Sequence, residues 1–236
     1  MVLAHGFTQN RHCWGGLDSA LAERATVLRV DLPGHGSSHS LRADVSKGAE
    51  LLGTAGGVAH YVGYSMGGRH VMRLALDRPD LVQSAVLIGT NPGIEDTAER
   101  VARREADQAR ASRIEKIGVE AFLKEWLALP LFAGLNPHQA NVPARLGNRA
   151  EGLAASLRLA GTGSQEPMWS RLPSLRAPVF FMAGERDAKY AAMGTRAAGL
   201  SPGGIRPVVI PGAGHAAHLE RPEAVLRVVS SWLDEH

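Results

Sequence analysis

Short apolar segments alternate with segments of helical periodicity along most of the chain. The apolar segments, most of them apolar at nearly every position, are residues 2–4, 27–31, 58–62, 85–88, 179–183 and 207–210. Strands of this kind are typical of a parallel sheet that is covered on both faces. Helical stretches are expected at residues 67–77, 191–200 and 222–233. The alternation predicts an α/β domain with a mostly parallel sheet flanked by helices.

Residues 91–171 interrupt this alternation. They contain no convincing strand, and helices are expected at residues 97–117, 119–129 and 151–159. Ligands bind at the carboxyl edge of open α/β sheets, so a helical insertion after a strand is predicted to be a lid over the site. A packed helical subdomain without that role is the alternative. We therefore expect a core formed by residues 1–90 and 172–236 and a helical lid formed by residues 91–171.

Composition narrows the function classes. Of 236 residues, 44% are hydrophobic, which suffices for a core, and 26 Lys and Arg against 23 Asp and Glu give a net charge of +3. These charges are interspersed, so we expect no nucleic-acid partner. We find no run of apolar residues long enough to span a membrane and no secretory signal, and the single cysteine, Cys13, cannot form an internal disulfide. A cytoplasmic location without membrane association is expected.

A candidate nucleophile lies in Gly63-Tyr64-Ser65-Met66-Gly67, which matches the pattern G-x-S-x-G. The motif follows a predicted strand and precedes a predicted helix. A sharp strand–turn–helix connection requires small residues on both sides of the nucleophile, because larger side chains would clash there. Ser65 is therefore predicted to be the nucleophile, with an ordinary serine in a tight turn as the alternative.

A base and an acid are found after two later strands. His215 ends the segment Pro211-Gly212-Ala213-Gly214-His215, and Asp187 ends Gly184-Glu185-Arg186-Asp187. The order Ser65, Asp187, His215 is that of the catalytic triad of α/β-hydrolases. Glu185 is the alternative acid, and His218 is the competing but less suitable base. Such a triad needs no cofactor, and we find no dinucleotide fingerprint or metal-ligand cluster, so neither a cofactor nor a metal is expected.

An oxyanion hole needs two backbone N–H groups directed at the developing negative charge. One is expected from Met66, the residue after the nucleophile, and the second from Phe7 in the segment His5-Gly6-Phe7. The segment Asp31-Leu32-Pro33-Gly34-His35-Gly36 is rich in turn-forming residues. We therefore expect His35 to be structural rather than catalytic.

Over its whole length the sequence resembles the α/β-hydrolase superfamily. Within it, the chain resembles the menaquinone-pathway family of 2-succinyl-6-hydroxy-2,4-cyclohexadiene-1-carboxylate synthases. The nucleophile, His-Gly and Pro-Gly-His-Gly motifs are shared across the superfamily. The features more specific to the synthase family are Arg69 after Ser65-Met66-Gly67-Gly68, Asn91-Pro92-Gly93, Pro130-Leu131-Phe132 and Gly161-Thr162-Gly163-Ser164.

This resemblance implies an unusual use of the triad, in which serine and histidine act as a base on a carbon acid, pyruvate is eliminated and no acyl-enzyme forms. It also implies a cationic pocket for a small, anionic substrate. The residues that match this pocket by position are Tyr64, Arg69, Arg103, Trp126 and either Arg145, our choice, or Arg149. For Arg103, a solvated helix face is the alternative. Guanidinium groups suit carboxylates because they bind them in a bidentate manner.

Two other functions remain open at this level. A serine carboxylesterase or C–C bond hydrolase would use the same triad, and a non-catalytic ligand-binding protein could keep the fold.

In one respect the chain departs from the synthase pattern, because Met1 lies only four residues before His5, where relatives usually have an additional strand or strand pair. An uncovered sheet edge can pair with another chain, which favours a homodimer or aggregation.

Overall fold

A parallel β-sheet forms the centre of the computed structural model, which describes residues 1–235. The strand order is β2-β1-β3-β4-β5-β6, and every pair of neighbours is parallel. The strands are β1 (Val2–Ala4), β2 (Leu28–Val30), β3 (Ala59–Tyr64), β4 (Val82–Ile88), β5 (Val179–Gly184) and β6 (Ile205–Ile210). The predicted strands are therefore present, and β4 and β6 begin earlier than expected.

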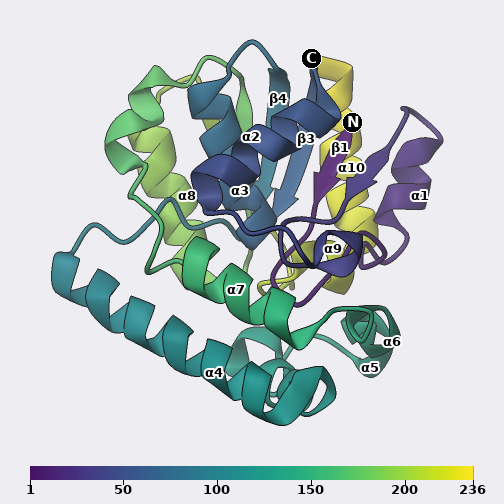
Figure 1. Cartoon of the computed structure of the whole chain (residues 1–236). Helices are drawn as coiled ribbons and strands as arrows, with labels where there is room; N and C mark the ends of the chain where they lie inside the picture. The colour runs from purple at the N-terminus through teal and green to yellow at the C-terminus, as the bar shows by residue number, and fades with distance from the viewer. Residues whose placement is uncertain (236) are drawn as a thin grey trace.

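Helices cover both faces of this sheet (Figure 1). Successive residues of β4 alternate between two cores, with Ala85 and Leu87 in one and Val86 and Ile88 in the other. Burial on both faces explains why this strand is apolar at nearly every position. The first face is covered by α2 (Val45–Gly56), α3 (Met66–Asp77) and α8 (Ala188–Leu200), and the second by α1 (Leu17–Ala22), α9 (Ala217–Glu220) and α10 (Pro222–Glu235).

Helix α2 is absent from the expected elements. It contains Gly48 and Gly53, which weaken a helical signal because glycine has low helix propensity. In the fold these glycines allow α2 to approach α3 closely. A Cβ at Gly48 would lie 2.5 Å from the His70 ring, and one at Gly53 would lie 2.7 Å from Leu74.

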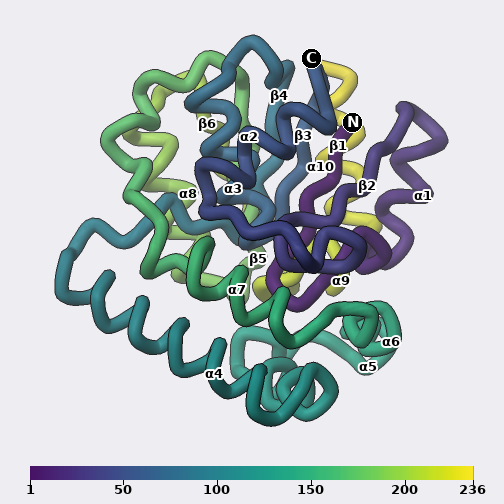
Figure 2. Tube along the Cα trace, in the orientation of Figure 1, coloured from purple at the N-terminus to yellow at the C-terminus, as the bar shows by residue number. Residues whose placement is uncertain are grey.

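Residues 91–171 are helical and lie across the carboxyl end of the sheet (Figures 1 and 2). The long helix α4 (Thr97–Leu127) has a break at Gly118, where φ is 78° and ψ is 170°, so the two helices expected there are nearly continuous. It packs against α7 (Ala150–Ala160) through Ala111, Ile114, Leu153 and Leu157. The other elements of this segment are η2 (Pro130–Phe132), α5 (Pro137–Ala140), α6 (Val142–Arg145) and α7 (Ala150–Ala160), and η3 (Trp169–Ser174) extends beyond its end. The short helix η1 (Gly36–Ser38) lies earlier, between β2 and α2.

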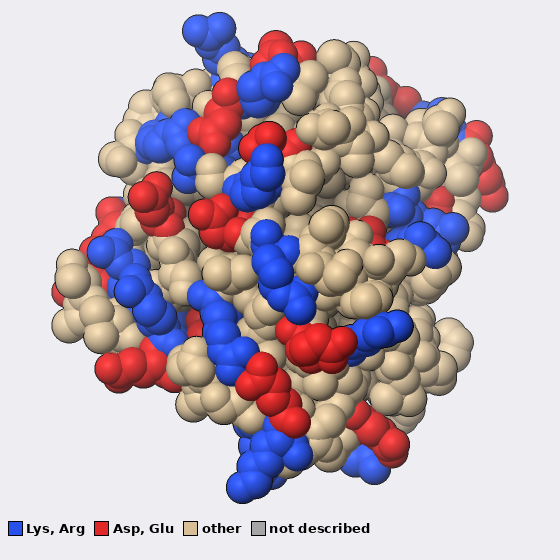
Figure 3. All heavy atoms as spheres, viewed as in Figure 1, with Lys and Arg blue, Asp and Glu red and all other residues tan. Residues whose placement is uncertain are grey.

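The surface is mixed in charge. Figure 3 shows lysines and arginines beside aspartates and glutamates over the face in view, as the interspersed sequence predicts. No helix within residues 1–235 combines the length and the apolar character needed to cross a bilayer. Strand β2 forms one edge of the sheet and β6 the other. The expected homodimer stays a prediction.

Candidate active site

The candidate nucleophile lies at the sharp turn between β3 and α3. Ser65 has φ 50° and ψ −105°, a left-handed φ that is rare for a residue with a side chain, and its N–H donates to the Ile88 carbonyl at 2.7 Å. Neighbouring glycines make the turn sterically possible. A Cβ at Gly67 would overlap the Ala4 carbonyl, and one at Gly63 would lie 2.6 Å from the Gly68 Cα.

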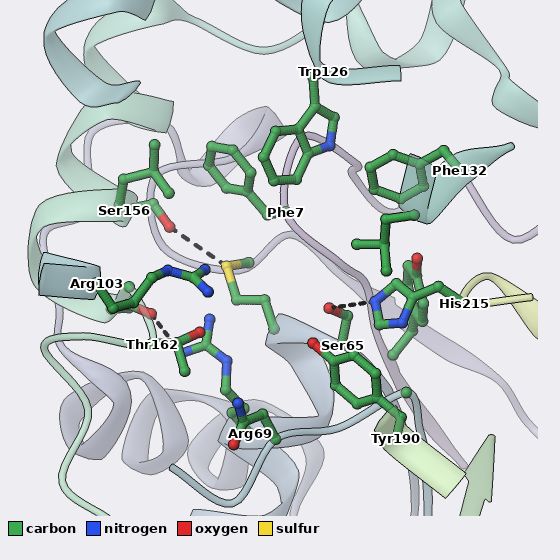
Figure 4. A pocket seen from close by; sticks show the side chains of 18 of the residues that line it. Phe7, Ser65, Arg69, Arg103, Trp126, Phe132, Ser156, Thr162, Tyr190 and His215 are labelled. Carbon is green, nitrogen blue, oxygen red and sulfur yellow. Dashed lines mark hydrogen bonds between the residues drawn. The ribbon is translucent and has the colours of Figure 1, made fainter. Parts of the chain in front are cut away.

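Ser65, His215 and Asp187 meet in one hydrogen-bonded chain, although they are distant in the sequence. The Ser65 hydroxyl lies 3.2 Å from Nε2 of His215 (Figure 4), and Nδ1 of the same ring lies 2.7 Å from Oδ2 of Asp187. If Nδ1–H donates to Asp187, Nε2 is free to accept the serine proton. This geometry can generate a serine alkoxide or withdraw a proton from a bound substrate.

The two alternative residues lie elsewhere. The Glu185 carboxylate accepts the N–H of Gly212 at 2.8 Å and so holds the loop before His215 rather than its ring. His218 is buried between the rings of Trp14 and Tyr64, and burial lowers its pKa to about 3, which keeps it neutral. Among residues 1–235, neither ring nitrogen of His218 has a hydrogen-bond partner.

The expected structural role of His35 fits its surroundings. Its Nδ1 lies 3.1 Å from the Pro33 carbonyl oxygen, and its ring packs edge-on against His5 and Phe7. It contacts no member of the triad through a hydrogen bond. The ring instead supports the loop that carries Phe7.

The two residues whose amides are expected to form the oxyanion hole both line the cavity beside Ser65. Met66 is the first residue of α3, and Phe7 lies in the loop after β1. Within residues 1–235, neither amide donates a hydrogen bond to another group. The loop of Phe7 is held by a bond from the Gly6 N–H to Oε1 of Gln9 at 2.9 Å. Both N–H groups are thus available to an oxygen atom of a ligand.

A cavity of about 120 Å³ opens onto Ser65 and His215. Three arginines from separate elements, Arg69, Arg103 and Arg145, contribute to its lining. Aromatic side chains lie over it in Figure 4, where Trp126 and Phe132 come from the helical segment and Phe7 from the sheet domain. The arginines therefore make one side of the cavity cationic, and the aromatic side chains make another side apolar. Ser65 and His215 line the same cavity.

Arg69 and Arg145 are buried guanidinium groups. Arg69 donates to the Ala160 carbonyl at 2.6 Å and to Oε1 of Gln165 at 3.1 Å, while Arg145 donates to the Ala140 carbonyl at 2.6 Å and to the Thr8 hydroxyl at 2.5 Å. Burial lowers the pKa of Arg69 to about 10 and also lowers that of Arg145, and at pH 7 Arg69 remains charged. None of the ion pairs within residues 1–235 involves either arginine.

Arg103 differs because it has a carboxylate partner. Its Nε donates to Oδ1 of Asp107 at 2.9 Å, and this buried aspartate also lies 3.4 Å from Arg110 and 3.5 Å from the N–H of Gly163. Asp107 thus fixes Arg103 on α4 while the guanidinium reaches the cavity. Arg149, the alternative to Arg145, is exposed at the start of α7 and does not line the cavity.

The two aromatic residues expected in the pocket are both present there. The Trp126 ring packs against Phe122 at 5.9 Å and edge-on against Phe7 at 5.2 Å between centroids. The Tyr64 ring lies 5.4 Å from that of His215, and burial raises its pKa, so its phenol is neutral. Asn91, Phe132 and Thr162 also line the cavity, and each lies in a segment that the sequence analysis identified as specific to the synthase family without giving it a role. Tyr190, which lines the cavity, and Asp107, which holds Arg103, were assigned no role from the sequence.

A comparison of the sequence with known families agrees with this architecture. The family described as "Alpha/beta hydrolase family" matches residues 1–228. The chain belongs to this family. The predicted α/β-hydrolase fold is thereby confirmed, and the six parallel strands flanked by helices are consistent with it.

Individual relatives are similar over nearly the full chain. Proteins named 2-succinyl-6-hydroxy-2,4-cyclohexadiene-1-carboxylate synthase from Escherichia coli O1:K1 and Klebsiella pneumoniae are each 32% identical, over 99% of this chain and 93% of theirs. The solved structure of MenH from S. aureus is 29% identical with a TM-score of 0.92, covering 99% of this chain and 92% of that one. The resemblance to the synthase family is confirmed, and the chain is an enzyme of the α/β-hydrolase fold.

More distant structures share the fold. An esterase from Thermogutta terrifontis, solved with malate bound, is 24% identical with a TM-score of 0.84, covering 99% of this chain and 89% of that one. At this level of identity the likeness concerns the fold alone. It carries no argument about the reaction of the present protein.

Proposed function

We propose that the protein is a carbon–oxygen lyase that eliminates pyruvate from a succinyl-cyclohexene carboxylate and forms the product for which its relatives are named. Two independent findings support this function. The relatives named as synthases match 99% of the chain, and the cavity at Ser65 is lined by arginines. The observation that carries the proposal is that Arg69 and Arg145 are buried without a carboxylate partner in residues 1–235.

The charge of the cavity selects an anionic substrate. Removing a guanidinium group from water costs several kcal/mol unless a counter-charge and hydrogen bonds offset the loss. Asp107 supplies the counter-charge for Arg103, whereas Arg69 and Arg145 have only neutral acceptors. A substrate with at least two carboxylates would supply the missing charges and could form bidentate hydrogen bonds with these arginines.

The triad would act as a proton-transfer unit in this reaction. His215, through the Ser65 hydroxyl, takes a proton from an acidic carbon next to a carbonyl group. The N–H groups of Phe7 and Met66 stabilise the resulting enolate oxygen. The electron pair then forms a new carbon–carbon double bond while the carbon–oxygen bond to the leaving group breaks. The departing enolate takes up a proton and becomes pyruvate, so no acyl-enzyme is required.

The helical segment of residues 91–171 would serve as a lid, and residues 1–90 and 172–236 would form the core. Trp126 and Phe132 project from the segment toward the cavity (Figure 4), and Arg103 and Arg145 reach the cavity from the same segment. Closure over the substrate would exclude water, which strengthens the electrostatic interactions and protects the enolate. Substrate binding would thus use Arg69 of the core together with Arg103 and Arg145 of the lid, whereas the triad comes from the core alone.

A serine carboxylesterase is the second candidate. The specific observation in its favour is the hydrogen bond between Ser65 and His215, since this geometry also activates a serine for attack on an ester. The uncompensated arginines would then select acidic esters. The two candidates differ in whether an acyl-enzyme forms and whether pyruvate is released.

The deciding experiment supplies the succinyl-cyclohexene substrate and, separately, short p-nitrophenyl esters. We expect stoichiometric pyruvate release without an acyl-enzyme burst. The Ser65→Ala variant should lose activity by several orders of magnitude, whereas Ser19→Ala, which alters an exposed serine on α1, should retain it. Ester turnover with a burst and without pyruvate would overturn the lyase proposal. Unchanged activity of Ser65→Ala would show that another residue is the base.

A further inference from the structure

Tyr190 lies between the triad and the arginine side of the cavity. It is in the first turn of α8, three residues after Asp187, and its N–H donates to the Asp187 carbonyl at 3.0 Å. Its ring packs on the imidazole of His215, with 4.6 Å between centroids and an angle of 49°. Figure 4 shows its hydroxyl directed into the cavity, near Ser65 and facing the side from which Arg69 and Arg103 extend.

The hydroxyl of Tyr190 makes no hydrogen bond to any group in residues 1–235. By contrast, the hydroxyl of Tyr61, a residue of β3 that does not line the cavity, donates to the Gly57 carbonyl at 2.6 Å. Phenol hydroxyls in partly buried positions usually find a partner. The Tyr190 hydroxyl is therefore free to serve a ligand in the cavity.

The surroundings of this hydroxyl make it a donor. Burial raises the pKa of Tyr190, and the negative charge of Asp187 raises it further, while Arg103 and Arg69 act in the opposite direction. The phenol is consequently neutral at pH 7 and can donate its proton in a hydrogen bond. The two guanidinium groups attract an anion to the same region, and hydrogen bonds to an ionised acceptor are stronger than neutral ones.

We propose that Tyr190 is a substrate-binding residue whose hydroxyl donates a hydrogen bond to the substrate carboxylate held by Arg69 and Arg103. The inference rests on the proposed function in one respect, namely that the ligand bears a carboxylate. Because the same side chain packs on His215, it sets the distance between that carboxylate and the base. It also selects carboxylates over neutral groups of the same shape, since a neutral group accepts a weaker hydrogen bond.

The test compares Tyr190→Phe with the matched control Tyr61→Phe. Each variant loses one hydroxyl and keeps its ring, so packing is preserved. Binding of succinate, with the neutral succinamide as a reference ligand, is measured by calorimetry on the full chain. We expect Tyr190→Phe to weaken succinate binding about tenfold to hundredfold, the range for loss of a hydrogen bond to a charged group. Tyr61→Phe and the wild-type protein should bind succinate equally, and succinamide should bind poorly throughout.

Equal succinate affinity in Tyr190→Phe and the wild-type protein would overturn the proposal, and so would a wild-type protein that does not bind succinate. Thermal unfolding of both variants shows whether the fold is intact. Steady-state kinetics add a second readout, in which Tyr190→Phe should raise KM more than it lowers kcat. If the wild-type protein releases no pyruvate but Tyr190→Phe still weakens succinate binding, the proposed lyase function fails while the role of Tyr190 stands.

Discussion

Arg69 shows how one residue can define the ligand of this cavity. Its side chain is buried, stays charged at pH 7 and donates only to the neutral acceptors of Ala160 and Gln165. Arg78 has the same chemistry in a different setting, where it pairs with Asp80 at the surface with 54% of its side chain exposed. Exposed pairs contribute little to stability, whereas a buried unpaired cation requires a counter-charge. The setting, and not the residue type, thus makes Arg69 a candidate for binding an anionic ligand.

At this scale we predict that Arg69→Ala raises KM for a carboxylate-bearing substrate by about tenfold to hundredfold, because a charge-assisted hydrogen bond is lost. KM for a neutral p-nitrophenyl ester should change little. The KM of Arg69→Lys for the carboxylate-bearing substrate should fall between those of the wild-type protein and Arg69→Ala, since lysine keeps the charge but not the bidentate geometry. Arg78→Ala is the surface control and should resemble the wild-type protein. Equal effects of Arg69→Ala on both substrates would remove Arg69 from the substrate-binding pocket.

The connection from β3 to α3 is the element on which the geometry of the triad depends. It has to reverse direction within a few residues and still present Ser65 to His215. The close approach of α3 to β1 is possible because Gly67 has no side chain, since a Cβ there would overlap the Ala4 carbonyl. Gly199, near the end of α8, offers a matched comparison, because a Cβ at that position would meet no atom within 4 Å.

We predict that Gly67→Ala displaces the start of α3 and lowers both the melting temperature and the activity. Overpacking of this kind typically costs about 1–3 kcal/mol of unfolding free energy. Gly199→Ala should be neutral or stabilising by up to about 1 kcal/mol, because alanine has the higher helix propensity. Thermal unfolding and the pyruvate assay measure the two effects. A fully active and stable Gly67→Ala protein would contradict this account of the turn.

On the scale of the whole molecule, the buried histidines couple folding to pH. Burial lowers the pKa of His5 and His70 to about 4 and lowers those of His35 and His218 as well. An unfolded histidine titrates near pH 6.5. Between these values the unfolded chain binds more protons than the native protein, so the free energy of unfolding falls as the pH falls. The stabilisation from neutral buried histidines is complete above about pH 6.5.

We therefore predict a loss of stability between about pH 6.5 and about pH 4, with a slope of up to about 1.4 kcal/mol per pH unit for each such histidine. Urea unfolding at pH 7 and pH 5 measures this slope. His70→Asn, whose amide can still donate to the Met66 carbonyl, should reduce the slope by the contribution of one histidine, which is up to about 1.4 kcal/mol per pH unit. His138→Asn, on the exposed helix α5, should leave it unchanged. A slope that is equal in all three proteins would contradict the assignment to His70.

Features that depend only on neighbouring residues were predictable from the amino-acid sequence. Strand β5 is apolar throughout and β4 is apolar from Ala85 to Ile88, because both faces of these segments are buried, and this pattern is local. The turn at Ser65 requires small neighbours, which the motif contains. The order Ser65, Asp187, His215 follows from the fold, since each residue comes after a parallel strand whose carboxyl end lies at the same edge of the sheet.

Which side chains face the cavity depends on how distant segments pack together in the folded protein. Arg145 lines it and Arg149 does not, Asp187 rather than Glu185 contacts His215, and the hydroxyl of Tyr190 points inward. On a helix, adjacent residues point about 100° apart, so the face that each one occupies depends on how the helix packs against the others. Packing of α4 on α7 involves contacts between residues far apart in the chain. The pattern of neighbouring residues does not specify those contacts, because they form only when distant segments pack together in the folded molecule.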